Sequence, residues 1–156
     1  MRLDVHQHLR EELAQIRDLI EQVRDGAIGA GEARSAINQM TMRQNNWTLG
    51  AYCAAYCRVV TMHHGYEDSG VFPHLRRSDT GLRPIIDRLE QEHVVIHDVL
   101  DEVDRALVDF VARPTDFGPL SSAADLMTDA LLSHLSYEER QILEPVAQYR
   151  FYTGHV

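Results

Sequence analysis

The chain has 156 residues, of which 44% are hydrophobic and 25% charged, and its formal net charge is -9 at pH 7. This composition fits one globular domain over residues 1–156, and the acidic balance argues against nucleic acid as a partner, because phosphate binding needs clustered lysine and arginine. No apolar run approaches the roughly 20 residues that span a bilayer. The charged N-terminal stretch lacks the apolar centre of a signal peptide, so we expect a cytoplasmic protein with no membrane partner.

The first half of the chain is predicted to form two helices, because its apolar residues recur at intervals of three and four. The first helix carries an apolar stripe from Leu9 to Val23 and is predicted to end at Asp25–Gly26, where glycine favours a helix stop. A second helical region runs from about residue 32 to about residue 74. Asn45–Asn46 are predicted to break or kink this second helix, and residues 76–81 to form a loop.

The second half predicts two further helices with the same periodicity. The third begins at Pro84, since proline suits the first helical turn, and keeps its register to Phe110. Residues 113–118 form the next loop, and the fourth helix extends from about Leu120 to about Tyr149. Four amphipathic helices on short loops pack as a bundle with their apolar stripes inward. The predicted fold class is therefore all-α, an antiparallel up-down four-helix bundle.

Histidines and acids occupy positions where the apolar stripes of the last two helices require leucine. On the third helix the core positions 86, 89, 93, 96, 100 and 103 include His93, and His97 lies one turn further along the same face. On the fourth helix the core positions 127, 131, 134 and 138 are Met, Leu, His134 and Glu138. Both helices are thus predicted to turn imidazoles into the core.

The first two helices repeat this pattern. The stripe 52, 56, 59 and 63 of the second helix ends on His63, and Glu67 comes one turn later. On the first helix His6 lies close to the Leu9 line, whereas His8 points away from it. His64 is also expected to point off the core stripe of its helix. Seven polar side chains are therefore predicted to converge inside the bundle: His6, His63, Glu67, His93, His97, His134 and Glu138.

A core with five imidazoles and two carboxylates points to bound metal ions. Burying an unpaired carboxylate costs several kcal/mol, so buried charges are normally paired or bound to metal. Imidazole nitrogen with carboxylate oxygen suits zinc, iron, copper or nickel. Seven ligands exceed one tetrahedral zinc site but fit two six-coordinate ions that share bridging carboxylates. The sequence therefore predicts a dinuclear metal site in the core of the bundle.

An internal repeat supports the pairing of the ligands. HHGYED, residues 63–68, and HLSYEE, residues 134–139, both read His-x-x-Tyr-acid-acid, and each offers one imidazole and one acid a helical turn apart. His64–Asp68 has the same spacing as His63–Glu67, and the alignment of the two copies favours His63. On the fourth helix Glu139 remains the alternative to Glu138. Tyr66 and Tyr137, the tyrosines of the repeat, could contact the ligands or pack in the core.

His6, HHGYED, EHVVIH and HLSYEE together resemble the hemerythrin-like, HHE cation-binding family of four-helix bundles, over about residues 5–146 with a short C-terminal tail. The resemblance implies two non-heme iron ions with an oxo or hydroxo bridge and one open position for dioxygen. His93, His97 and His134 would bind one iron, His6 and His63 the other, and Glu67 and the fourth-helix acid would bridge.

Many relatives have aspartate five residues after the last histidine, and that position is Glu139 here. Without the long N-terminal arm of oxygen-carrying members, the His6 side of the site is expected to be more open to solvent.

Three functions fit this pattern. The first is a binding protein for dioxygen, nitric oxide or peroxide, acting in storage, delivery or sensing. The second is a di-iron enzyme with peroxidase, catalase or oxidase activity, for which the sequence assigns no catalytic residue. The third is a structural or metal-storing bundle. A ferritin-like di-iron site is excluded, because it needs two Glu-x-x-His motifs and the chain offers only Glu90-x-x-His93.

Overall fold

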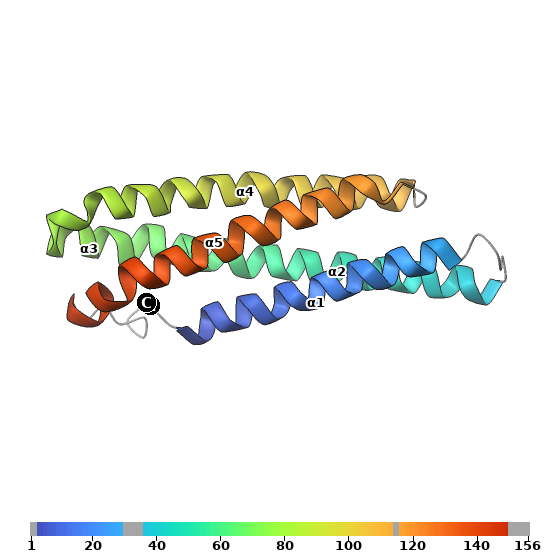
Figure 1. Ribbon diagram of the computed structural model, residues 1–156, viewed down its shortest axis with the longest axis horizontal. Helices are drawn as coiled ribbons and strands as arrows, with labels where there is room; N and C mark the ends of the chain where they lie inside the picture. The colour runs from blue at the N-terminus through green and yellow to red at the C-terminus, as the bar shows by residue number, and fades with distance from the viewer. Residues whose placement is uncertain (1–2, 30–35, 114–115, 150–156) are drawn as a thin grey trace.

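The chain is almost entirely helical in the parts that the computed structural model describes, which are residues 3–29, 36–113 and 116–149. Four long helices lie side by side as an antiparallel bundle: α1 (Leu3–Gly29), α2 (Ala36–Tyr66), α4 (Arg83–Ala112) and α5 (Gly118–Tyr149) (Figure 1). α1 packs against α2 and α5, and α4 packs against the same two helices. The predicted all-α antiparallel bundle is confirmed, and none of the helices described is long and apolar enough to cross a membrane.

Three short helical segments connect α2 to α4 at one end of the bundle. They are the π-helical turn η1 (Glu67–Val71), α3 (Phe72–Ser78) and the 3-10 turn η2 (Thr80–Leu82). In the π turn the Phe72 N–H donates to the Glu67 carbonyl, five residues back. Pro73 follows directly and has no N–H of its own, so a regular α-helical ladder cannot continue through this point.

Several predicted helix boundaries were wrong by a few residues, and one predicted break was wrong altogether. α2 runs without interruption through Asn45–Asn46, since asparagine costs a helix little. The irregularity lies instead at η1, which begins at Glu67. α1 continues past Gly26 to Gly29, and α4 begins at Arg83 with Pro84 in its first turn, as predicted. The tail after residue 149 lies outside the described residues.

The buried core consists of two apolar clusters with a polar layer between them. The larger cluster includes Val60 of α2, Ile96 of α4 and Leu131 of α5. The smaller cluster lies towards the α3 end and includes Phe72, Leu89 and Ile142. On α4 and α5 the polar side chains fall between these clusters, and six buried polar side chains make up the layer: His6, His64, Glu67, His93, His134 and Glu138. The apolar clusters thus close the polar layer on both sides.

The register of α5 against the core can be tested with two adjacent leucines. Leu131 is 0% exposed and Leu132 is 38% exposed. In protein kept metal-free with a chelator, Leu131→Ala should lower the free energy of unfolding by about 2–5 kcal/mol, because it leaves a cavity in the core. Leu132→Ala should change it by about 0.5 kcal/mol or less. Urea denaturation of both variants measures the difference, and equal destabilisation would contradict the register.

Candidate metal centre

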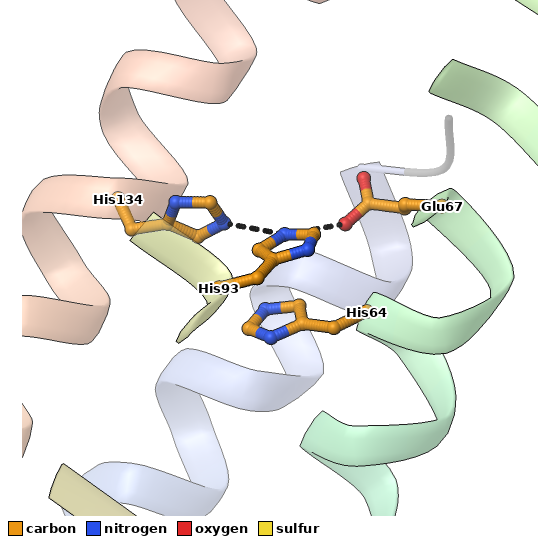
Figure 2. A group of neighbouring side chains, drawn as sticks. All are labelled: His64, Glu67, His93 and His134. Carbon is orange, nitrogen blue, oxygen red and sulfur yellow. Dashed lines mark hydrogen bonds and ion pairs between the residues drawn. The ribbon is translucent and has the colours of Figure 1, made fainter. Parts of the chain in front are cut away.

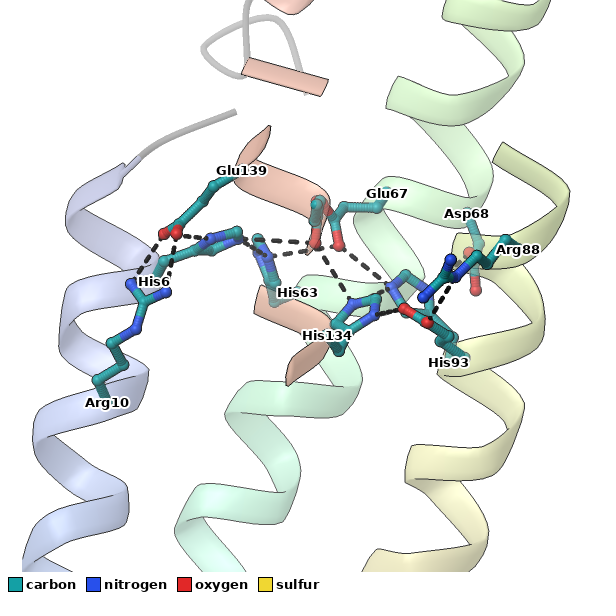
Figure 3. Close-up of polar contacts among 11 residues, drawn as sticks. His6, Arg10, His63, Glu67, Asp68, Arg88, His93, His134 and Glu139 are labelled. Atoms are coloured by element: carbon teal, nitrogen blue, oxygen red, sulfur yellow. Dashed lines mark hydrogen bonds and ion pairs between the residues drawn. The ribbon is translucent and has the colours of Figure 1, made fainter. Parts of the chain in front are cut away.

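All four long helices contribute to the polar layer, and their imidazoles and carboxylates converge at its centre (Figure 3). α1 provides His6, and the end of α2 together with η1 provides two histidines and Glu67. α4 provides His93, and α5 provides the last pair of ligand candidates. These side chains form two groups of possible ligand atoms: His6, His63, Glu67 and Glu138 in one, and His64, Glu67, His93 and His134 in the other.

The first group joins α1, α2 and α5. The Nε2 atoms of His6 and His63 are 3.2 Å apart, and His63 Nε2 is 3.4 Å from Glu67 Oε1. His6 Nε2 is 3.8 Å from Glu138 Oε2. Two donor atoms bound to one ion at about 2.1 Å, at angles near 90–110°, lie about 3.0–3.4 Å from each other. The first group therefore has nearly the spacing that a bound ion requires.

The second group joins α2, α4 and α5 (Figure 2). His93 Nε2 is 3.1 Å from His134 Nε2 and 3.4 Å from Glu67 Oε1. The ring of His64 lies against the ring of His93, with centroids 3.7 Å apart and planes 8° from parallel. These separations again match two or more donors around one ion.

Each buried carboxylate lies between the two groups. Glu67 Oε1 is 3.4 Å from the Nε2 atoms of both His63 and His93. Glu138 Oε2 is 3.3 Å from His134 Nε2 and 3.8 Å from His6 Nε2. Two carboxylates placed between two sets of imidazoles are consistent with a binuclear metal site.

Three imidazoles are oriented by carboxylates on the outer side of the layer. The Nδ1 atom of His93 is 2.8 Å from Asp68 Oδ1, and that of His134 is 2.9 Å from Glu92 Oε1. His6 Nδ1 lies 3.2 Å from Glu139 Oε1. A carboxylate accepts a hydrogen bond, so each Nδ1 carries the proton and each Nε2 presents a lone pair to the centre.

Arginines hold two of these outer carboxylates. Arg10 binds both oxygens of Glu139 at 2.8 Å, and Arg88 donates to Glu92 at 3.1 Å. The hydrogen bond from Arg10 lowers the pKa of Glu139, which stays an anion and an acceptor. The Arg88 guanidinium also lies 3.8 Å over the ring of Tyr137, which makes Tyr137 a neighbour of this pair.

Burial keeps the imidazoles of the metal-free layer neutral. Desolvation lowers the pKa of His63 to about 4 and that of His93 to about 2, and it lowers the pKa of His6, His64 and His134 as well. Desolvation also raises the pKa of Glu138 to about 8. Neutral imidazole is the form that binds a metal ion.

The layer also contains buried polar atoms without hydrogen bonds. Within the described residues, neither carboxylate oxygen of Glu67 or Glu138 has a hydrogen-bond partner, and neither ring nitrogen of His64 has one. Such atoms cost free energy when they are desolvated without compensation. The Nε2 lone pairs of His93 and His134, whose Nδ1 atoms both donate to carboxylates, face each other at 3.1 Å and add repulsion. Cations would satisfy both the oxygens and the lone pairs, so the donor set fits metal ions.

The structure brings six of the seven sequence-predicted ligands into the two groups and leaves His97 outside them. His97 is half-buried, and its ring centroid is 6.1 Å from that of His64. Of the two fourth-helix acids, Glu138 lies in the centre, while Glu139 binds Arg10 at its edge. His8 is exposed, as expected.

Two expectations about exposure were wrong. His64 is 0% exposed instead of pointing off the core. Adjacent residues of a helix point about 100° apart, so at the end of α2 His63 faces α1 while His64 faces α4. His6 is also 0% exposed, so its side of the centre is closed in the described part of the chain. Buried Glu138 and the Arg10–Glu139 pair cover it.

The sequence did not predict the residues that orient the imidazoles. Arg10, Arg88, Asp68 and Glu92 act from outside the apolar stripes, where charged residues are ordinary. One weak signal was present, since Arg88 and Glu92 are four residues apart and Glu92 directly precedes His93. Yet Glu92 orients His134 on another helix, which no spacing along α4 indicates.

Comparison with known proteins gives a single finding. The model of the Hemerythrin HHE cation binding domain matches residues 3–146, which cover the bundle and every residue of the two groups. No curated protein and no solved structure matches the chain.

The buried imidazoles should make the metal-free protein sensitive to acid. They stay neutral in the folded state but bind protons in the unfolded chain below their ordinary pKa of about 6.5, so acid favours unfolding. Glu138 acts in the opposite direction, because its raised pKa lets the folded state hold a proton that the unfolded chain releases. Several imidazoles outweigh one carboxyl, so the Tm of chelated protein should fall between pH 7 and pH 5. A constant or rising Tm in thermal melts would contradict this balance.

The outer carboxylates should control metal affinity. Glu139→Ala removes the acceptor for His6 Nδ1 and the partner of Arg10, so divalent metal binding should weaken by about 10–100-fold. Glu144→Ala, at an exposed position of the same helix, is the matched control and should bind normally. Titration of the chelator-treated proteins with cobalt(II), followed by visible absorption, measures both affinities. Equal affinities would show that Glu139 does not orient a ligand.

Proposed function

The chain belongs to the hemerythrin HHE cation-binding domain family, and we propose that it is a non-heme di-iron protein that binds dioxygen or a related small ligand, nitric oxide or peroxide. Its role would be the binding, storage or sensing of that ligand or of iron. The position of Glu67 Oε1, 3.4 Å from an imidazole of each group, is the observation that carries the proposal. A carboxylate held between two sets of imidazoles suits a dinuclear centre, whereas a single-ion site has no use for it.

The donors favour iron over a lone zinc ion. Zinc in proteins is usually tetrahedral, and one such ion would leave donors of the other group unsatisfied. Imidazole and carboxylate together suit iron, and two iron ions would supply reversible electron transfer and open positions for a small ligand. The proposed ligands are His6, His63, Glu67, His93, His134 and Glu138. His97, the seventh ligand expected from the sequence, stays a prediction.

The enclosure of the centre supports a small ligand. His6 and Glu138 are 0% exposed, and the smaller apolar cluster covers the layer towards α3. A diatomic molecule or a peroxide can reach such a site through small fluctuations of the helices, whereas a large organic substrate needs an open pocket. Neutral imidazoles outnumber carboxylates among the proposed ligands. Anionic donors stabilise high-valent iron, so a site with few of them favours reversible binding.

A peroxide-consuming di-iron enzyme is the second candidate, and Tyr137 is the observation that favours it. Its ring lies under the guanidinium of Arg88. Arg88 donates a hydrogen bond to Glu92, and Glu92 also accepts one from His134. A phenol linked to a ligand through three contacts is placed to deliver an electron towards the centre. Tyr137→Phe should therefore slow peroxide consumption in an enzyme and leave the reversible binding of dioxygen unchanged in a carrier.

Metal content and spectra test the proposal directly. Protein expressed with iron available should contain about two irons per chain, by the count of donors in the two groups. Reduced protein exposed to oxygen should develop a near-ultraviolet and visible charge-transfer band. A stable band that disappears when oxygen is removed supports the carrier, and rapid bleaching with loss of peroxide supports the enzyme. One zinc and no iron per chain would rule out the di-iron centre.

A further inference from the structure

We propose that His64 supplies the third imidazole to the ion held by His93 and His134, in the position that the sequence pattern gives to His97. This inference rests on the proposed dinuclear centre and changes its ligand set. It assigns a metal-binding role to a histidine that the helical stripe of α2 left outside the core.

The burial of His64 is the first observation behind this assignment. Its side chain is 0% exposed, and within the described residues neither of its ring nitrogens has a hydrogen-bond partner. An imidazole that only filled space would leave two polar atoms desolvated without compensation, and a hydrophobic side chain would serve better. One nitrogen of His64 does have possible partners, because it lies within 4.8 Å of ligand atoms of Glu67, His93 and His134.

The antiparallel arrangement explains why His64 and His97 are alternatives. α2 runs towards the smaller apolar cluster and α4 runs away from it. His64 precedes Glu67 on α2 and His97 follows His93 on α4, so the two histidines lie at a similar height in the bundle. The two rings are perpendicular neighbours, with centroids 6.1 Å apart. His97 is half-buried and belongs to neither group, while His64 is inside the second group. Of the two imidazoles at this level, His64 is the one among the donors.

The contacts of His64 also suggest how it would reach the ion. Its ring is stacked on His93 and lies 5.2 Å from the ring of His134 at 73° (Figure 2). The lone pairs of stacked rings lie in parallel planes, so the His64 ring would turn out of the stack to share an ion with His93. Phe72 lies on His93 as well, with centroids 5.5 Å apart, and would still pack there after the rotation.

A purely structural role for His64, as a ring stacked on His93, is the competing explanation. Phenylalanine separates the two explanations, because it retains the ring and its burial but has no donor atom. The matched pair is His64→Phe and His97→Phe, with His64→Leu as a second variant should the larger ring fold poorly. Each protein is treated with chelator, its Tm is measured, and it is then titrated anaerobically with iron(II) and analysed for bound iron.

The metal-ligand role predicts opposite effects on the two forms of the protein. Metal-free His64→Phe should melt at the wild-type temperature or up to about 6 °C higher, because two unsatisfied polar atoms are removed. The same variant should lose one iron or bind it at least about 10-fold more weakly, while His97→Phe keeps both. Wild-type iron binding by both His64 variants, or loss of iron by His97→Phe to the same extent, would overturn the assignment of His64 alone. Failure of the wild-type protein to bind two irons would overturn the proposed centre itself.

Discussion

The fold is organised around a conflict between packing and polarity in the middle of the bundle. Two apolar clusters border a layer in which the Nε2 lone pairs of His93 and His134 face each other at 3.1 Å and two carboxylates have no hydrogen-bond donor in the described structure. An apolar interior makes every uncompensated polar atom costly. Cations between the imidazoles resolve this conflict, because they satisfy lone pairs and carboxylates at once. We therefore expect the stability of the protein to be coupled to metal binding.

The hydrogen bond that each imidazole makes at Nδ1 determines whether its Nε2 can bind a metal ion. Asp68, Glu92 and Glu139 accept from Nδ1, and this leaves Nε2 unprotonated on the side of the centre. Arg10 and Arg88 bind two of these acids at the border of the layer, where solvent can screen the charges that would be expensive inside. The centre is thus prepared for cations by residues that never touch them.

The π turn η1 places Glu67 and Asp68 at the polar layer and leads into the end of the bundle. Glu67 opens the turn and lies between the two groups, and Phe72, which closes it, packs in the smaller cluster and on the ring of His93. Across this turn Glu67 lies near the Nε2 atoms of His63 and His93, while Asp68 accepts from Nδ1 of the same His93, so the two acids contact opposite ends of one imidazole. Irregular turns of this kind are frequent at functional sites.

The sequence by itself determined the four helices, their antiparallel bundle and a polar layer with the composition of a metal site. These follow from periodicity, because a stripe repeated every three or four residues records which face of a helix is buried. It could not determine which of His63, His64 and His97 enter the layer, since adjacent residues of α2 face different neighbours and His64 meets α4 only in the assembled bundle. Nor could it assign Glu92 to His134 or Arg10 to Glu139, which are far apart in the chain. Such contacts depend on the relative rotation and level of packed helices, which the tertiary structure alone decides.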